Sequence, residues 1–104
     1  MARVDKNFRD RVYAVVAQIP KGRAMTYGQV AAATGAAWAA WEVGQIAHTG
    51  PDGLPWQRVV NKQGGLANGY PGGRAGHKAA LEAEGIKVAA DFKVDIKQLL
   101  WQPL

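Results

Sequence analysis

The chain has 104 residues, of which 48% are hydrophobic and 20% are charged. This length and balance predict one folded domain spanning residues 1–104 and exclude a disordered chain. No apolar run approaches the roughly 18 residues of a membrane span, and the first residues are charged rather than apolar. We therefore expect no membrane partner and no secretory signal, and a cytoplasmic protein that acts at the bacterial nucleoid.

Basic residues outnumber acidic ones, 13 to 8, and the net charge of +5 favours a polyanionic partner such as nucleic acid. Between Ala24 and Gln57, however, there is no Lys or Arg. The sequence also has no cysteine, which excludes disulfides, thiolate metal sites and cysteine nucleophiles. With only two histidines as the remaining nitrogen ligands, we expect no metal and no cofactor.

The first half of the chain has the periodicity of three helices. Asp5 to Gln18 reads as an amphipathic helix that ends at Pro20. A second helix is expected from Thr26, which has capping-box spacing to Gln29, and a third from about Trp38 to His48. Two short helices joined by a glycine-containing turn are typical of a helix-turn-helix.

The second half is less regular. Residues 49–73 are rich in glycine and proline around one strand-like run at 58–60, and a fourth helix fits Arg74 to Glu84, with Gly85 as its C-terminal stop. The tail, residues 89–104, alternates apolar and polar residues as a strand does. The expected fold is mainly α with a few short strands: a winged-helix-like DNA-binding domain that contains a helix-turn-helix.

Four segments occur in an order typical of one family. They are 19–22 with 26–28, then 43–44, then Pro-Trp-Gln-Arg-Val-Val at 55–60, and finally 64–73 leading to 84–85. Over about residues 8–88 the chain resembles the DNA-binding domain of O6-alkylguanine-DNA alkyltransferases. In those enzymes the third segment reads Pro-Cys-His-Arg-Val, and its cysteine accepts the alkyl group. Trp56 and Gln57 stand at the Cys and His positions, a pattern that resembles the alkyltransferase-like proteins, which bind the lesion without removing it.

The chemistry of these residues agrees with that resemblance. Direct dealkylation needs a soft, activated nucleophile, and an indole offers one N–H donor and no nucleophile, so we expect no enzyme. Trp56 is predicted either to stack on the alkylated base or to fill core volume. Glu84 matches the glutamate of the family's relay but has no imidazole to orient; it is equally explained as a carboxylate in the last helical turn. The predicted lesion pocket consists of Trp56, Gln57, Tyr70 and Glu84.

The third helix differs from the family at an informative position. Trp41 stands where the resemblance places an arginine that enters the duplex. It shares one helical stripe with Trp38, Gln45 and His48, whereas Val43 belongs to an apolar face. If the Val43 face is buried, both tryptophans are exposed and Trp41 can act as an apolar wedge; otherwise the tryptophan stripe is core or a protein-binding surface.

The remaining predicted DNA contacts come from other segments. Tyr27 matches the family tyrosine that presses on the phosphate 3′ to the target, although a half-buried aromatic at a helix start explains it too. Arg58 is either structural or DNA-facing. The full predicted DNA-binding set is Tyr27, Trp38, Trp41, Gln45, Arg58 and Lys62, with backbone affinity supplied by Lys21, Arg23, Arg58, Lys62 and Arg74.

These observations predict a monomeric protein that flips O6-alkylguanine out of double-stranded DNA, approached from the minor groove, without alkyl transfer. The resemblance further implies that it flags the lesion for nucleotide-excision-repair factors. A sequence-specific winged-helix regulator is the alternative, but of the residue types that read bases the recognition helix offers only Gln45. A hydrolase would have to use His48, His77, Asp52 and Glu84, which lack an accompanying nucleophile or metal motif.

Overall fold

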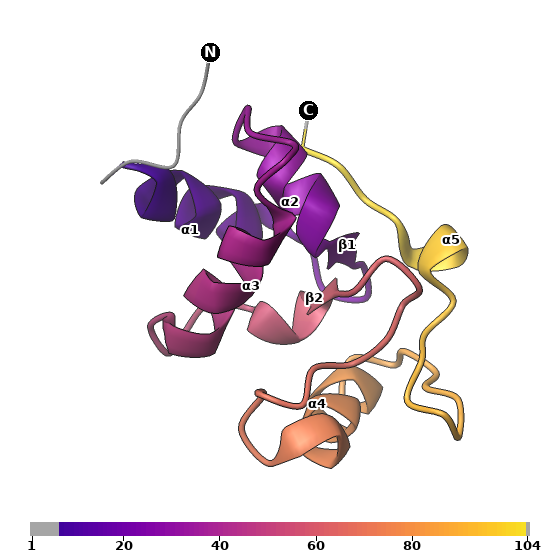
Figure 1. Ribbon diagram of the computed structural model, residues 1–104. Helices are drawn as coiled ribbons and strands as arrows, with labels where there is room; N and C mark the ends of the chain where they lie inside the picture. Colours follow the sequence, from indigo (N-terminus) through magenta and orange to yellow (C-terminus); the bar gives the residue numbers. More distant parts are fainter. Residues whose placement is uncertain (1–6, 104) are drawn as a thin grey trace.

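The computed structural model describes residues 7–103, and its elements follow the order drawn in Figure 1. Five helices and two short strands are joined by long loops, and one turn of 3-10 helix, η1, precedes the second strand. Within residues 7–103 no helix is long and apolar enough to cross a membrane. The elements are α1 (Phe8–Gln18), β1 (Met25–Thr26), α2 (Tyr27–Ala33), α3 (Ala40–Thr49), η1 (Trp56–Arg58), β2 (Val59–Val60), α4 (Gly73–Glu82) and α5 (Ile96–Leu99).

The helix-turn-helix is formed by α2 and α3. The Thr26 hydroxyl accepts from the Gln29 N–H at 3.1 Å, and the Gln29 side chain accepts from the Thr26 N–H at 2.9 Å, which is the predicted capping box. Val30 of α2 and Val43 of α3 are fully buried, and both belong to the core cluster that also contains side chains of α1. The prediction of a mainly helical domain with a helix-turn-helix is therefore confirmed.

The two strands pair in parallel, with Met25 opposite Val59 and Thr26 opposite Val60. Because α2 and α3 lie between them in sequence, this pairing fixes η1, immediately before β2, beside the start of the helix-turn-helix. One parallel bridge, from Ala24 to Leu100, attaches the segment after α5 to the residue that precedes β1.

Apolar side chains gather in two clusters. The larger joins α1, α2, α3 and the strands, and the smaller joins β2 and α4 to the loops that follow them. Val59 belongs to the first cluster and the next residue, Val60, to the second, since consecutive side chains of a strand point to opposite sides. The short strand β2 is thus the joint between the two halves of the core.

Some predicted boundaries need correction. The strand expected in the tail is not formed: Lys93 makes one antiparallel bridge to Gly65, and α5 begins at Ile96. Asp95 caps that helix by accepting from the Gln98 N–H, so a local polar contact overrides the alternating pattern. The fourth helix spans residues 73–82 rather than 74–84, and the predicted start of the first helix at residue 5 lies outside the described residues.

Candidate functional site

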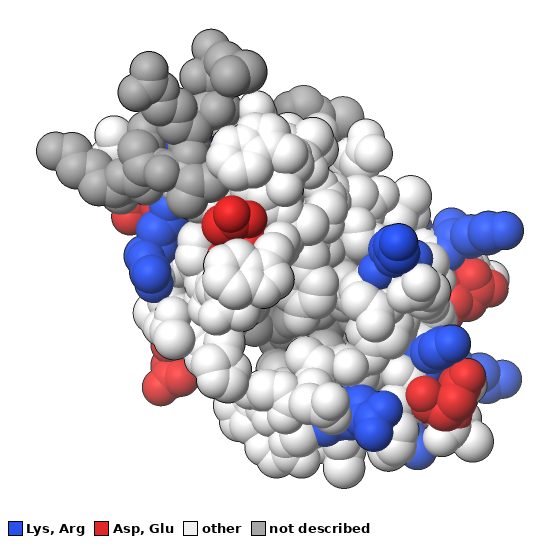
Figure 2. Space-filling view, viewed as in Figure 1, with Lys and Arg blue, Asp and Glu red and all other residues white. Residues whose placement is uncertain are grey.

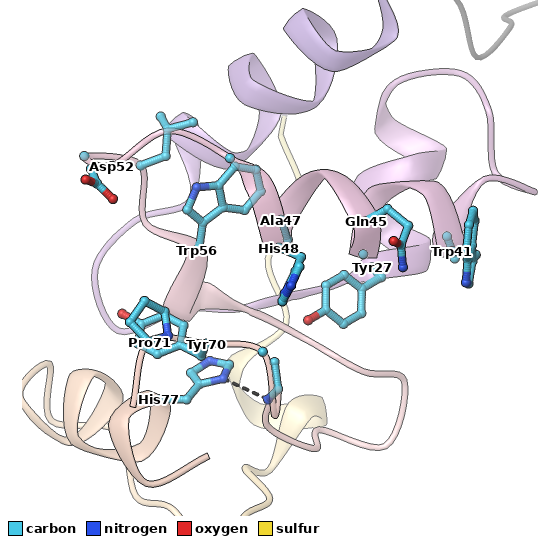
Figure 3. Close-up of a pocket in the computed structure, with 17 residues that line it drawn as sticks. Tyr27, Trp41, Gln45, Ala47, His48, Asp52, Trp56, Tyr70, Pro71 and His77 are labelled. Atoms are coloured by element: carbon cyan, nitrogen blue, oxygen red, sulfur yellow. Dashed lines mark hydrogen bonds between the residues drawn. The ribbon is translucent and has the colours of Figure 1, made fainter. Parts of the chain in front are cut away.

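A cavity of about 820 Å³ opens between α3 and the segment formed by residues 67–71 and α4. Figure 3 shows aromatic and imidazole side chains directed into it from both sides. This volume is within the range of about 300–1,000 Å³ that is usual for small-molecule pockets. The lining side chains that matter below are Tyr27, Trp41, Gln45, His48, Trp56, Tyr70 and His77.

The Trp56 indole forms one wall of the cavity and is held by three contacts. Its Nε1–H donates to the Pro51 carbonyl oxygen at 3.1 Å, and its ring meets Tyr13 edge-on with centroids 6.0 Å apart. The ring also lies so close to Gly50 that a Cβ at that position would overlap it. Trp56 is half-buried and packs on the larger core cluster. Its only donor is occupied, so the indole offers the cavity an apolar surface.

Tyr70 and His77 form the opposite wall. Their rings are stacked, with centroids 4.7 Å apart and planes 18° from parallel. His77 is fully buried, and both of its ring nitrogens have backbone partners, Ala67 and Gln57. The structure therefore brings Trp56 and Tyr70, two of the four predicted pocket residues, to one cavity.

The other two predicted pocket residues, Gln57 and Glu84, lie behind the cavity and do not line it. The Gln57 amide donates to the Glu84 carboxylate at 2.8 Å, and the same carboxylate accepts from the Gly22 N–H at 2.9 Å. Arg58 donates through Nε to both carboxylate oxygens, at 2.9 and 3.0 Å, and through Nη1 to the Ile19 carbonyl at 2.7 Å. We call this cluster of Gly22, Gln57, Arg58 and Glu84 the carboxylate clamp.

The clamp bears on the two interpretations that the sequence left open for Arg58 and for Glu84. Arg58 donates through Nε and Nη1 to acceptors within the protein, as its structural interpretation requires. Glu84 follows the last turn of α4, as its structural interpretation required, and its side chain is only 8% exposed. Desolvation opposes ionisation of this carboxyl, but hydrogen bonds from Arg58, Gly22 and Gln57 outweigh it and lower the pKa of Glu84.

The outer face of α3 carries two exposed tryptophans. Val43 is fully buried and Ile46 is 7% exposed, whereas Trp41 is 71% exposed and Trp38, in the turn before the helix, is 62% exposed. The Val43 face is therefore buried, which is the condition under which both tryptophans were predicted to be exposed. Gln45 is exposed on the same side, and it lines the cavity together with Trp41.

The last two predicted DNA contacts lie at different places. Tyr27 begins α2, is half-buried and points into the cavity, where burial raises the pKa of its phenol. Its hydroxyl has no hydrogen-bond partner within residues 7–103, so it is free to meet a ligand oxygen. Lys62 is exposed in the turn after β2 and does not line the cavity.

Charge is distributed unevenly around the cavity. Figure 2 shows a hollow in a largely uncharged face, with Lys and Arg gathered toward its edges. The scarcity of positive charge follows from the sequence, since the segment from Ala24 to Gln57 supplies α2, α3 and the Trp56 wall without a single cation, and its charged side chains are Glu42 and Asp52. Residues 7–103 contain no group of three acidic, histidine or cysteine side chains placed to hold a metal ion.

Two residues that shape the walls of the cavity, His77 and Gly50, were not predicted. His77 shares a helical face with Leu81, four residues later, and that spacing to a buried leucine was the available signal for its burial. Gly50 gave no signal, because its importance lies in the approach of an indole from six residues further along the chain.

Replacing Glu84 with Gln should destabilise the protein by about 2–3 kcal/mol, since it leaves the half-buried Arg58 without its charged partner. Because the pKa of Glu84 is lowered, the contribution of its carboxylate to the free energy of unfolding is fully present above pH 4.5. This contribution is lost as the pH falls through the folded-state pKa. Urea unfolding as a function of pH measures both effects. Equal stability of the two proteins at pH 7 would contradict the clamp.

Replacing Gly50 with Ala should displace the Trp56 ring, because the added methyl group overlaps it. The indole Nε1–H resonance of Trp56 is expected to shift as its bond to Pro51 weakens, while the other indole signals stay in place. Gly28→Ala is the matched control, since a Cβ there meets only an ordinary contact at 3.9 Å. An unchanged Trp56 resonance in the Gly50 variant would refute the close approach.

Comparison with known proteins connects this architecture to one family. Residues 7–86 match the family model described as the 6-O-methylguanine DNA methyltransferase DNA-binding domain. A DNA base-flipping protein of Vibrio parahaemolyticus is 40% identical, over 92% of this chain and 97% of that protein. Alkyltransferase-like protein 1 of Schizosaccharomyces pombe is 32% identical, over 92% of this chain and 95% of that protein.

Solved structures agree with this grouping. The crystal structure of S. pombe Atl1 in complex with damaged DNA containing O6-carboxymethylguanine superposes with a TM-score of 0.86 at 30% identity, covering 97% of this chain and 100% of that one. The Mycobacterium tuberculosis O6-methylguanine methyltransferase superposes with a TM-score of 0.70 at 35% identity, but this chain spans only 53% of its length. The chain therefore belongs to the family of the 6-O-methylguanine DNA methyltransferase DNA-binding domain, and its relatives include base-flipping and alkyltransferase-like proteins.

Proposed function

We propose that the protein binds double-stranded DNA containing O6-alkylguanine by taking the damaged base out of the helix and into the cavity beside Trp56, without alkyl transfer. The observation that carries this proposal is the cavity itself, which has an indole at the position of the enzymes' acceptor cysteine. Two relatives support it, the DNA base-flipping protein of Vibrio parahaemolyticus and S. pombe Atl1, whose structure is a complex with damaged DNA.

The walls of the cavity suit an alkylated purine. The Trp56 indole, with its N–H engaged by Pro51, presents an apolar surface to the alkyl group, and the Tyr70 ring supplies a second aromatic surface. Aromatic stacking on a base is worth about 1–3 kcal/mol per base. An alkylated guanine also pairs poorly, so its extrusion costs less than that of an intact base.

Two further residues are assigned to the extrusion step. Trp41 is proposed to enter the stack from the minor groove and fill the space that the flipped base leaves, as apolar wedges do in other minor-groove proteins. Tyr27, whose hydroxyl faces the cavity, is proposed to contact the phosphate next to the target. The cations at the edges of the face supply attraction to the DNA backbone, and the exposed Lys62 is assigned the same role.

The cavity offers no nucleophile for alkyl transfer. Direct transfer needs a thiolate and a base to activate it, and the chain has no cysteine. Gln57, at the position of the enzymes' histidine, directs its amide into the carboxylate clamp. A bound lesion would therefore persist, and we propose that a cytoplasmic, monomeric protein bound in this way marks the site for nucleotide-excision-repair factors.

A titration with matched duplexes tests the proposal. We expect the protein to bind a duplex with one O6-methylguanine at least about tenfold more tightly than the same duplex with guanine, because stacking and easier extrusion favour the lesion. Fluorescence anisotropy of the labelled duplex measures both affinities. Raising the salt concentration should weaken both, since phosphate contacts release counterions, and leave their ratio nearly constant. Equal affinity for the two duplexes would refute the proposal.

Trp41→Ala should reduce lesion binding by about 1–3 kcal/mol through loss of stacking. The same change should alter the free energy of unfolding by less than about 0.5 kcal/mol, because the side chain is 71% exposed. Trp41→Phe, which keeps an aromatic wedge, is the matched control and should retain most of the affinity. Wild-type affinity of the Ala variant would remove Trp41 from the mechanism.

A further inference from the structure

His77 is fully buried, and its hydrogen bonds connect it to the segments that carry both walls of the cavity. It extends from α4 and makes contacts with two segments distant in sequence: η1, which carries Trp56, and the loop that carries Tyr70. None of the interactions described for DNA binding uses this imidazole. Its position behind the Tyr70 ring points to a role in the shape of the cavity.

The hydrogen bonds fix the protonation state of the ring. The Ala67 N–H donates to Nδ1 at 3.0 Å, so Nδ1 carries no proton. Nε2 lies 2.8 Å from the Gln57 carbonyl oxygen, which only accepts, and therefore Nε2 carries the proton and donates. The neutral ring thus satisfies one backbone donor and one backbone acceptor at the same time.

The two backbone partners determine what the ring holds in place. Gln57 directly follows Trp56, and Ala67 lies three residues before Tyr70, whose ring stacks on the imidazole. A single rigid ring consequently fixes the separation between the indole wall and the tyrosine wall. We propose that His77 is a positioning residue that sets the width of the lesion cavity and thereby its selectivity for an alkylated base; this inference rests on the proposed function.

Protonation would undo this arrangement. An imidazolium carries protons on both nitrogens, so Nδ1 could no longer accept from Ala67, and two N–H groups would face each other in a buried space. Burial lowers the pKa of His77 from its ordinary value of 6.5, and the bond to the Gln57 carbonyl opposes that shift. In a state in which the loop of Ala67 and Tyr70 has moved away from the ring, the His77 imidazole would have its ordinary pKa. Acidification below pH 6.5 therefore favours that open state over the arrangement in the structure.

Other ionisable groups around the ring have different roles. Arg58 follows Gln57 in the sequence and Glu84 follows α4, and these two side chains pair with each other in the carboxylate clamp. Glu84 stays ionised at pH 5 because its pKa is lowered. Burial and, to a smaller extent, the charge of Glu84 raise the pKa of Tyr70, which therefore stays neutral. The remaining groups on the surrounding elements are exposed or partly exposed: Tyr27, His48 and Asp52 across the cavity, and Arg74, Lys78 and Glu82 on α4.

The test is the ratio of affinities for O6-methylguanine and guanine duplexes, measured between pH 8 and pH 5. In the wild type we expect this ratio to fall by about tenfold over the range, as the cavity loses a hydrogen bond to a buried donor. His77→Gln, whose amide both donates and accepts but does not titrate, should keep selectivity at pH 8 and show a flat profile. His77→Leu should lose about tenfold in selectivity at every pH while still binding the guanine duplex.

His48→Gln removes the only other histidine of the sequence, which also lines the cavity, and the fall in selectivity between pH 8 and pH 5 should persist in this variant. Thermal unfolding identifies any variant that is not folded; if His77→Leu is among them, the profile of His77→Gln decides. A flat wild-type profile, or wild-type selectivity in folded His77→Leu, would overturn the inference. Failure of the proposed function is a distinct outcome, in which the wild type shows no selectivity even at pH 8.

Discussion

The arrangement of the site depends on the carboxylate of Glu84. It accepts hydrogen bonds from Gly22, Gln57 and Arg58, which lie in the turn after α1 and in η1, and it belongs to the turn that follows α4. Arg58 extends the cluster to the Ile19 carbonyl. One charged group therefore joins the three parts of the chain whose relative placement defines the cavity.

The clamp also explains how the site can keep its shape with a different chemistry. The resemblance places Trp56 and Gln57 where the related enzymes are expected to have cysteine and histidine, and in this chain Glu84 and Arg58 support the segment that carries them. Two local features accommodate the indole: the absence of a side chain at Gly50, and the carbonyl of Pro51 as a partner for its N–H. Trp56 is thereby held as an apolar wall of the cavity.

Local patterns in the sequence predicted the helices well, because capping and apolar periodicity act over a few residues. The Thr26–Gln29 capping box and the buried Val43 face are examples, and the exposure of Trp41 followed from the latter. The tail was predicted as a strand, since nothing in its alternation shows that Asp95 caps a helix turn. The roles of Gln57, Arg58 and Glu84 could not be separated from sequence, because the distinction between lining a cavity and lying behind it depends on contacts 26 and 27 residues apart.

A crystal structure of the protein bound to a duplex with one O6-methylguanine is the most direct test of the central claim, that the space between Trp56 and Tyr70 receives the damaged base. The account predicts an extrahelical guanine with its methyl group against the indole and with Trp41 in the stack at the vacated position. A complex in which the damaged base stays stacked in the duplex while the cavity is empty would contradict it.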